Sequence, residues 1–284
     1  MMQMMQNLNL GEVTTMHVQG GFFRLDGGAM FGIVPKILWE NKFTADCKNR
    51  IQLSCNCLLI KTPDTLALID TGFGTRLNKK SREQFEFTPA NALSDSLSEY
   101  GAKASDVDIV VLTHLHFDHM AGCLLEIDGT LVPTFPRATH YVQRGEWRDA
   151  VDGRSPMKSS YRPNDLRALE SQVEIKLIYG DTSITPHIST FITGGHTEWH
   201  QGVVIIGKNK SMVFPGDLIP TRAHLQSHWN MAYDAFPLQS IERKNQFIQD
   251  SLDNDWIVAW AHDPISPWNR LSTKDGRVCA IPLF

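Results

Sequence analysis

The chain has 284 residues, of which 42% are hydrophobic and 20% are charged, and its formal net charge at pH 7 is -4. This length and balance are typical of a soluble globular protein with enough core to fold without disulfide staples. The acidic balance and the lack of a basic stripe argue against nucleic acid as a partner, because binding to phosphates requires clustered positive charge. The five cysteines lack a repeated CxxC spacing, which favours reduced thiols over a disulfide framework.

Residues 1–15 are rich in methionine and lack both the basic and the continuous apolar segments of a secretory signal. No apolar run approaches the length that a membrane-spanning helix requires. We therefore expect a disordered N-terminus over residues 1–15 and a single domain over residues 16–284. The same observations predict a cytoplasmic location and no contact with a membrane.

A first strand is predicted over residues 13–25, and two glycines at positions 27 and 28 interrupt it. The apolar segment 29–39 follows and contains Met30, Phe31 and Trp39. Two interpretations of this segment stay open. It is either a loosely anchored piece of core or a mobile wall over an active site, because Met and Phe offer adaptable apolar contacts.

Two apolar runs, 57–60 and 66–69, surround the polar, proline-containing turn 61–64 and predict a hairpin. The second run ends at Asp70, which places a carboxylate at a strand tip beside glycines that let the backbone turn. Residues 90–101 carry apolar side chains at helical spacing and end on glycine, which predicts an amphipathic helix.

The apolar strand predicted over residues 109–112 leads directly into the sequence Thr-His-Leu-His-Phe-Asp-His. A strand ending there delivers His114 and His116, at alternate positions, to one side of its C-terminal edge. The following turn brings Asp118 and His119 to a neighbouring point. Crowding these groups without a cation would cost stability through desolvation and repulsion, so the cluster predicts metal binding. Two ligand sets offset by one turn favour two metal ions over one.

The chain then continues with a short helical piece after Gly122, a strand over residues 139–143 and a helix over residues 144–151. Residues 152–163 are rich in Gly, Ser, Pro and charge, which predicts an exposed loop or lid.

The second half of the chain repeats the arrangement of the first. A strand over residues 188–193 runs into a loop containing His196 and His200, and a second hairpin, 202–206 with 212–214, closes on Asp217. A helix is predicted over residues 238–252, and a strand over residues 256–261 ends at His262. Each candidate ligand therefore follows a strand, as an active site on an α/β scaffold requires.

The sequence His-x-His-x-Asp-His after a hydrophobic strand resembles the signature of the metallo-β-lactamase superfamily of dinuclear hydrolases. The resemblance implies a four-layer αβ/βα sandwich of two similar halves. It implies that His114, His116 and His196 hold one metal and that Asp118, His119 and His262 hold a second, with Asp217 bridging both. Asp70 resembles the family's buried aspartate, which orients a metal-binding histidine. His200 is expected to support its loop.

Two divalent cations can share a water and lower its pKa towards neutrality, so the expected chemistry is hydrolysis by a bridging hydroxide. Asp118 is the expected catalytic residue that receives and returns the proton. Zinc suits the nitrogen-rich ligands best, and such sites also accept iron, manganese or cobalt.

The segment 25–32 resembles the N-terminal loop of quorum-quenching lactonases, and Gly-His-Thr-x-x-His around His196 resembles both these lactonases and glyoxalase II enzymes. This resemblance implies hydrolysis of N-acyl-homoserine lactones, small molecules with an apolar part. It makes Met30, Phe31 and Trp39 apolar substrate contacts, and it allows a homodimer.

One position departs from the lactonase pattern, which has a tyrosine three residues after the bridging aspartate, where this chain has Pro220. Either Tyr233, His224 or His228 replaces that tyrosine, or the metals act alone. This departure keeps an organophosphate or carboxylic-ester hydrolase as the alternative. A glyoxalase II-type thioesterase, a tRNA-processing nuclease and a metal-binding module without turnover are less favoured.

Overall fold

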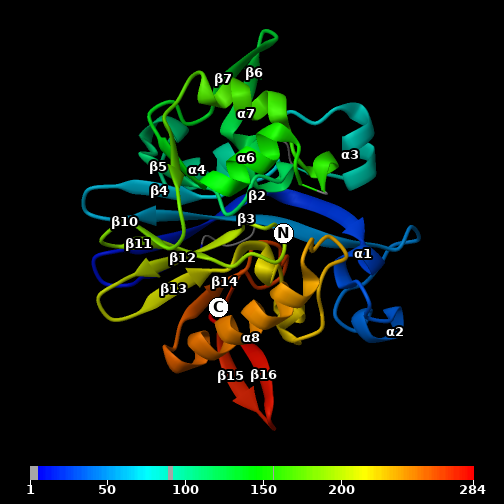
Figure 1. The fold of residues 1–284 in the computed structure, drawn as a ribbon. Coiled ribbons are helices and arrows are strands. Elements are labelled where there is room, and N and C mark those ends of the chain that lie inside the picture. Colours follow the sequence, from blue (N-terminus) through cyan, green and yellow to red (C-terminus); the bar gives the residue numbers. More distant parts are fainter. Residues whose placement is uncertain (1–5, 89–91, 156) are drawn as a thin grey trace.

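The computed structural model describes residues 6–88, 92–155 and 157–284. Two seven-stranded sheets lie face to face, and helices cover their outer surfaces (Figure 1). Among the described residues, no helix combines the length and the apolar character needed to cross a membrane.

The first sheet has the strand order β1-β2-β3-β4-β5-β8-β9. Its strands are β1 Asn7–Asn9, β2 Thr14–Asp26, β3 Arg50–Lys61, β4 Leu66–Ile69, β5 Ile109–Val111, β8 Thr139–Gln143 and β9 Ile175–Ile178. Strands β2, β3 and β4 pair antiparallel, whereas β4, β5, β8 and β9 pair parallel. The hairpin predicted around residues 61–64 is the β3–β4 connection.

The second sheet has the order β10-β11-β12-β13-β14-β15-β16. Its strands are β10 Thr182–Thr185, β11 Ile188–Ile192, β12 Gln201–Ile206, β13 Ser211–Phe214, β14 Ile257–Ala259, β15 Trp268–Lys274 and β16 Arg277–Pro282. Here too an antiparallel hairpin, β12–β13, is followed by a parallel partner, β14. The first five strands of each sheet thus share one pairing pattern, and the sheets differ in their last two strands, which pair parallel in the first sheet and antiparallel in the second. The predicted sandwich of two similar halves is confirmed.

Strand β3 shows how the layers are built. Successive side chains of a strand point to opposite faces, so Leu58 and Ile60 pack between the two sheets while Leu59 packs beneath the outer helices. Both faces are covered there, which explains why residues 57–60 of this strand are apolar without alternation.

The outer layers consist of helices packed on each sheet (Figure 1). The helices α4 Ala92–Glu99, α6 Arg144–Asp152 and α7 Pro163–Glu170 cover the first sheet, and α8 Pro237–Asp253 covers the second. The shorter helices are α1 Gly27–Phe31, α2 Lys36–Trp39, α3 Lys79–Phe85 and α5 Phe117–Met120. One-turn 3₁₀ helices are η1 Ala104–Asp106, η2 Ala121–Cys123, η3 Lys158–Ser160, η4 Gly216–Leu218 and η5 Arg222–Leu225.

The expectation of a disordered N-terminus is wrong for residues 6–15. Strand β1 pairs with β2 in the register Asn7 to Met16, and Leu10 and Val13 are fully buried in the core. Residues 1–5 lie outside the described part, as do residues 90 and 91 of the predicted helix 90–101.

The prediction of a short helix after Gly122 is also wrong. The helical turn α5 ends before Gly122, and η2 includes it. The chain after it forms a hairpin of β6 Leu124–Ile127 and β7 Thr130–Pro133. A second unpredicted hairpin joins β15 to β16. Both turns are Asp-Gly pairs with positive φ at each residue, Asp128-Gly129 and Asp275-Gly276. This dipeptide is a strong hairpin signal that the sequence analysis missed.

Candidate metal centre

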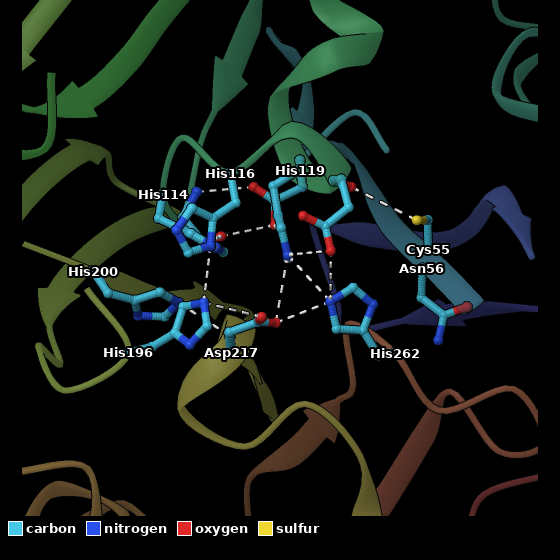
Figure 2. A network of polar contacts seen from close by, with 12 residues as sticks. Cys55, Asn56, His114, His116, His119, His196, His200, Asp217 and His262 are labelled. Atoms are coloured by element: carbon cyan, nitrogen blue, oxygen red, sulfur yellow. Dashed lines mark hydrogen bonds and ion pairs between the residues drawn. The ribbon is translucent and has the colours of Figure 1, made fainter. Parts of the chain in front are cut away.

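The candidate ligands meet at one end of the sandwich although they come from four separate segments. His114 and His116 follow β5, and Asp118 and His119 lie on α5. The other three follow strands of the second sheet: His196 after β11, Asp217 after β13 and His262 after β14. Figure 2 shows the five histidines among them pointing toward one another, with Asp217 between two groups of histidines.

The first group contains three histidines. His114 Nε2 and His196 Nε2 each lie 3.0 Å from His116 Nδ1. Ligand atoms about 2.0–2.1 Å from one tetrahedral zinc ion lie roughly 3.3 Å apart, so these nitrogens have the separation of ligands to one ion.

The second group contains His119, His262 and Asp118. His119 Nε2 lies 3.1 Å from His262 Nε2, and Asp118 Oδ2 lies 3.8 Å from both. Asp217 connects the two groups. Its Oδ2 lies 3.4 Å from His196 Nε2, and its Oδ1 lies 3.0 Å from His262 Nε2. One carboxylate therefore offers an oxygen to each group.

The hydrogen bonds of the Nδ1 atoms of His119 and His262, which face away from the cluster, indicate that these two residues are arranged to bind a cation. His262 Nδ1 lies 2.8 Å from the Ser54 carbonyl and His119 Nδ1 lies 2.8 Å from Asp70 Oδ2, so each Nδ1 carries the donated proton. In the neutral rings both Nε2 atoms then present lone pairs to each other. Two facing lone pairs repel unless a proton or a cation lies between them, and a bound metal ion would remove this repulsion.

The pKa values of these groups follow from burial and from the carboxylates among them. Burial, followed by neighbouring histidines, lowers the pKa of His114 well below its usual value and keeps the ring neutral. Burial also opposes protonation of His119, but Asp217, Asp118 and Asp70 outweigh it and raise the pKa of His119. Neutral imidazoles and ionised carboxylates are the forms that bind metals, so metal binding would release protons here.

Asp70 and His200 lie behind the cluster. The Asp70 carboxylate accepts hydrogen bonds from the Thr113 backbone N–H and hydroxyl, each at 2.8 Å, as well as from His119. His200 Nε2 accepts a hydrogen bond from the Asp217 backbone N–H at 3.0 Å. Its lone pair is used there, so His200 positions Asp217 and does not face the cluster as a ligand.

Two acidic residues were missed in the sequence. Asp234 Oδ1 lies 3.0 Å from His196 Nδ1 and fixes the orientation of that ring. Glu146, on α6, accepts hydrogen bonds from Leu115 N at 3.1 Å and from the Thr197 hydroxyl at 2.7 Å. It therefore joins the loops that carry His116 and His196. No local motif marks either residue, because each acts across a long sequence separation.

A cavity of about 790 Å³ opens above the cluster. His116, Asp118, His196, Asp217 and His262 form its floor. Part of its wall is apolar or aromatic and consists of Phe23, Leu25, Met30, Phe85, Met231 and Tyr233. Asp118 is more exposed than Asp217, the other carboxylate of the floor: 14% of its side chain is accessible, against 7% for Asp217.

The structure corrects three of the expected substrate contacts. Met30 and Tyr233 line the cavity, although only 1% of Met30 is exposed, whereas the fully buried Phe31, Trp39 and His224 do not line it. The Phe31 ring stacks between His224, at a centroid distance of 4.8 Å, and Trp39, at 5.4 Å. His224 Nε2 donates a hydrogen bond to the Met30 carbonyl at 2.8 Å. These three residues thus hold α1 in place, and the segment 29–39 supplies both core and wall.

A sandwich of two facing sheets, with a histidine and aspartate centre at its strand ends beneath a cavity, defines a metal-dependent hydrolase. The sequence model of the Metallo-beta-lactamase superfamily matches residues 50–262, and the chain belongs to this superfamily. Members of the superfamily typically bind divalent metals, in agreement with the cluster of histidines and aspartates.

Two curated relatives have related sequences. A probable metallo-hydrolase of Mycobacterium tuberculosis is 26% identical over 245 residues, which cover 75% of this chain and 76% of the relative. An N-acyl homoserine lactonase of Bacillus cereus is 25% identical over 228 residues, which cover 76% of this chain and 83% of the relative.

Two solved structures have the same fold. A probable metal-dependent hydrolase from Staphylococcus aureus has a TM-score of 0.89 and 29% identity, and the match covers 97% of this chain and 98% of that one. The dizinc quorum-quenching lactonase AidC, in complex with a product N-hexanoyl-homoserine, has a TM-score of 0.81 and 19% identity. That match covers 99% of this chain and 97% of the lactonase.

Proposed function

We propose that this hydrolase binds two divalent cations and opens the lactone ring of N-acyl-homoserine lactones. The observation that carries the proposal is the position of Asp217, which offers one oxygen to each of two ligand groups on the floor of a cavity with an apolar wall. The lactonase among the relatives and the lactonase among the structural neighbours support the choice of substrate.

The first cation would be held by His114, His116 and His196, and the second by Asp118, His119 and His262. Asp217 would contact both. Zinc is the proposed metal because five of the seven ligands are imidazoles, which also suit iron, manganese and cobalt. When bound, the two cations would activate water and polarise the substrate carbonyl.

The residues of the chain have separate roles in this reaction. Asp118 lines the cavity and would take up a proton at its carboxylate and return it to the leaving oxygen. Tyr233 would donate a hydrogen bond to the substrate, because burial raises the pKa of its phenol to about 12 and keeps the proton in place. Met30 and Met231 would contact the acyl chain.

Hydrolysis of carboxylic or phosphate esters at the same centre is the second candidate. Pro220 favours it, because this position lacks the tyrosine hydroxyl of the lactonase pattern. The Pro220 carbonyl accepts a hydrogen bond from the His262 N–H at 2.8 Å, so this residue supports the ligand loop instead.

The test is turnover of a substrate panel by purified protein of known metal content. The panel contains short-chain and long-chain acyl-homoserine lactones, paraoxon, a p-nitrophenyl ester and S-lactoylglutathione, with His116→Ala as the control. Lactone hydrolysis with kcat/KM of about 10⁴ M⁻¹s⁻¹ or more, lost in the control, would support the proposal. Turnover of another panel member at this level, without lactone hydrolysis, would refute the lactonase assignment. No turnover of any substrate would point to a metal-binding module.

A further inference from the structure

Besides its apolar side chains, the cavity has a cationic part of its wall. The lining residues include the four arginines Arg24, Arg50, Arg76 and Arg162, and polar side chains of the segments 78–84 and 159–160. The described lining residues contain no lysine. The sequence analysis did not assign a role to this wall, although Arg162 belongs to the predicted loop or lid 152–163.

Three of the four arginines have close carboxylate partners. Arg24 Nε lies 3.1 Å from Glu86 Oε2, and Arg50 Nε lies 2.9 Å from Asp46 Oδ2. Arg76 forms two hydrogen bonds with the Asp165 carboxylate, at 2.8 and 3.0 Å. Their charges are compensated within the protein, so they need no ligand.

Arg162 differs from the other three. Its nearest carboxylate oxygen, Asp165 Oδ2, lies 3.9 Å away and is already bonded to Arg76. Such a distance exceeds that of a hydrogen bond, and no other described group bonds to this guanidinium. The guanidinium lies 5.4 Å from the ring centroid of Phe117, the residue before Asp118. It therefore stands on the cavity wall next to the proposed second metal position.

A guanidinium held in this place is costly without an anion. Only 25% of the Arg162 side chain is exposed, and burial lowers the pKa of Arg162, although the charges of Asp165 and Asp118 act in the opposite direction. Stacking on Phe117 leaves the edge of the planar fork free for oxygen acceptors. Ser159 and Ser160, which precede it closely in the chain, also line the cavity.

We propose that Arg162 binds a carboxylate carried by the part of the substrate that is not hydrolysed. Arg76 and Arg162 together carry one positive charge more than the Asp165 carboxylate that they share, so Arg162 matches one further negative charge. Its guanidinium fork matches the two oxygens of a carboxylate. The inference deepens the proposed function and rests on it, because the carboxylate belongs to the same lactone or ester. Preferred substrates then carry an acyl chain that ends in a carboxylate.

Matched substrates test this subsite. N-glutaryl-homoserine lactone and N-pentanoyl-homoserine lactone have acyl chains of equal length and differ in the terminal carboxylate, as do mono-p-nitrophenyl glutarate and p-nitrophenyl pentanoate. We expect the wild-type kcat/KM to favour the charged member by about 10-fold or more. Arg162→Gln should abolish the preference by raising KM for the charged member alone. Arg162→Lys should retain part of it, because an ammonium keeps the charge without the fork.

Lys158→Gln is the matched control, since it removes one exposed positive charge from the same segment without touching the cavity. It should leave the preference unchanged. A wild-type enzyme without the preference, or an Arg162→Gln variant that loses activity equally on both members of a pair, would overturn the proposal.

A binding measurement separates this proposal from the proposed function. Glutarate is titrated calorimetrically into the metal-loaded wild-type protein and the metal-loaded Arg162→Gln variant, both with melting curves that establish folding. We expect at least 10-fold weaker binding to the variant, and equal binding would refute the subsite. If neither lactones nor esters are hydrolysed, the proposed function fails, and the glutarate titration still decides the role of Arg162.

Discussion

Glu146 and Thr197 join two loops that lie far apart in the sequence, through a hydrogen bond of 2.7 Å between the Thr197 hydroxyl and Glu146 Oε2. The other carboxylate oxygen accepts hydrogen bonds from Leu115 N and from the Tyr161 hydroxyl, each at 3.1 Å. Glu146 is fully buried, so these bonds have no competition from solvent. It fixes the backbone beside three candidate ligands without facing the cluster.

Replacing Glu146 with alanine should therefore weaken metal binding at the first site. Leu115 N and the Thr197 hydroxyl would lose their acceptor, and removal of such an outer partner typically costs 10- to 100-fold in metal affinity or activity. Competition with a chromophoric chelator measures the affinity. Glu198→Ala is the control, because this neighbouring carboxylate is exposed. Unchanged affinity in Glu146→Ala would show that the loops hold their positions without the carboxylate.

Removing the metal should lower the thermal stability as well as the activity. The facing lone pairs of His119 and His262 then lose their common cation, and a ligand that binds only the folded state stabilises it by mass action. Chelator treatment should lower the Tm, and added Zn²⁺ should restore it. The response should be much smaller in Asp217→Ala, which removes the carboxylate shared by both groups. An equal Tm response in this variant would contradict the bridging role.

Phe31 and Met30 are adjacent, yet their substitution should have different effects. Phe31→Ala empties a fully buried position between two stacked rings and should cost about 3–5 kcal/mol of stability, as aromatic truncations in cores do. Met30 is also buried but lines the cavity, so Met30→Ala should raise KM for acyl substrates several-fold in addition to lowering the stability. Chemical denaturation and steady-state kinetics distinguish the two. A KM change with Phe31→Leu, without loss of stability, would restore Phe31 as a substrate contact.

The stability should decrease as the pH falls from about 6.5 to about 4, in part because of His17. Burial lowers the pKa of His17 from 6.5 to about 4, although its hydrogen bond to Asn56 opposes the shift. Between these values the unfolded state binds a proton that the folded state does not, so acidification favours unfolding. His17→Gln should flatten the slope by up to about 1.4 kcal/mol per pH unit.

Urea unfolding at several pH values, with equal metal content in both proteins, measures this difference. Ligand protonation affects the wild type and the variant alike, so the difference between their slopes reports His17. Parallel slopes would mean that His17 has an ordinary pKa in the folded protein.

Much of the candidate site was predictable because its signals are local. Alternation along β5 places His114 and His116 on one side, and the turn into α5 brings Asp118 and His119 beside them, so short-range geometry groups four ligands. The β3–β4 and β12–β13 hairpins have equally local signals in their apolar runs and polar turns. The hairpins at Asp128-Gly129 and Asp275-Gly276 were predictable from the same kind of signal.

The contacts of single side chains were decided by the tertiary structure. Phe31 and Met30 are both apolar and buried, and only the packing of α1 against Trp39 and His224 turns Phe31 into the core and leaves Met30 lining the cavity. Glu146 acts on loops that are distant in the sequence. The proposed role of Arg162 depends on Asp165 being hydrogen-bonded to Arg76. The amino-acid sequence by itself determined the central strands, the longer helices and the metal-binding motif, because periodicity and turn chemistry act between near neighbours. The cavity wall and the supports of the ligands depend on which distant elements meet, and that is a property of the packed fold alone.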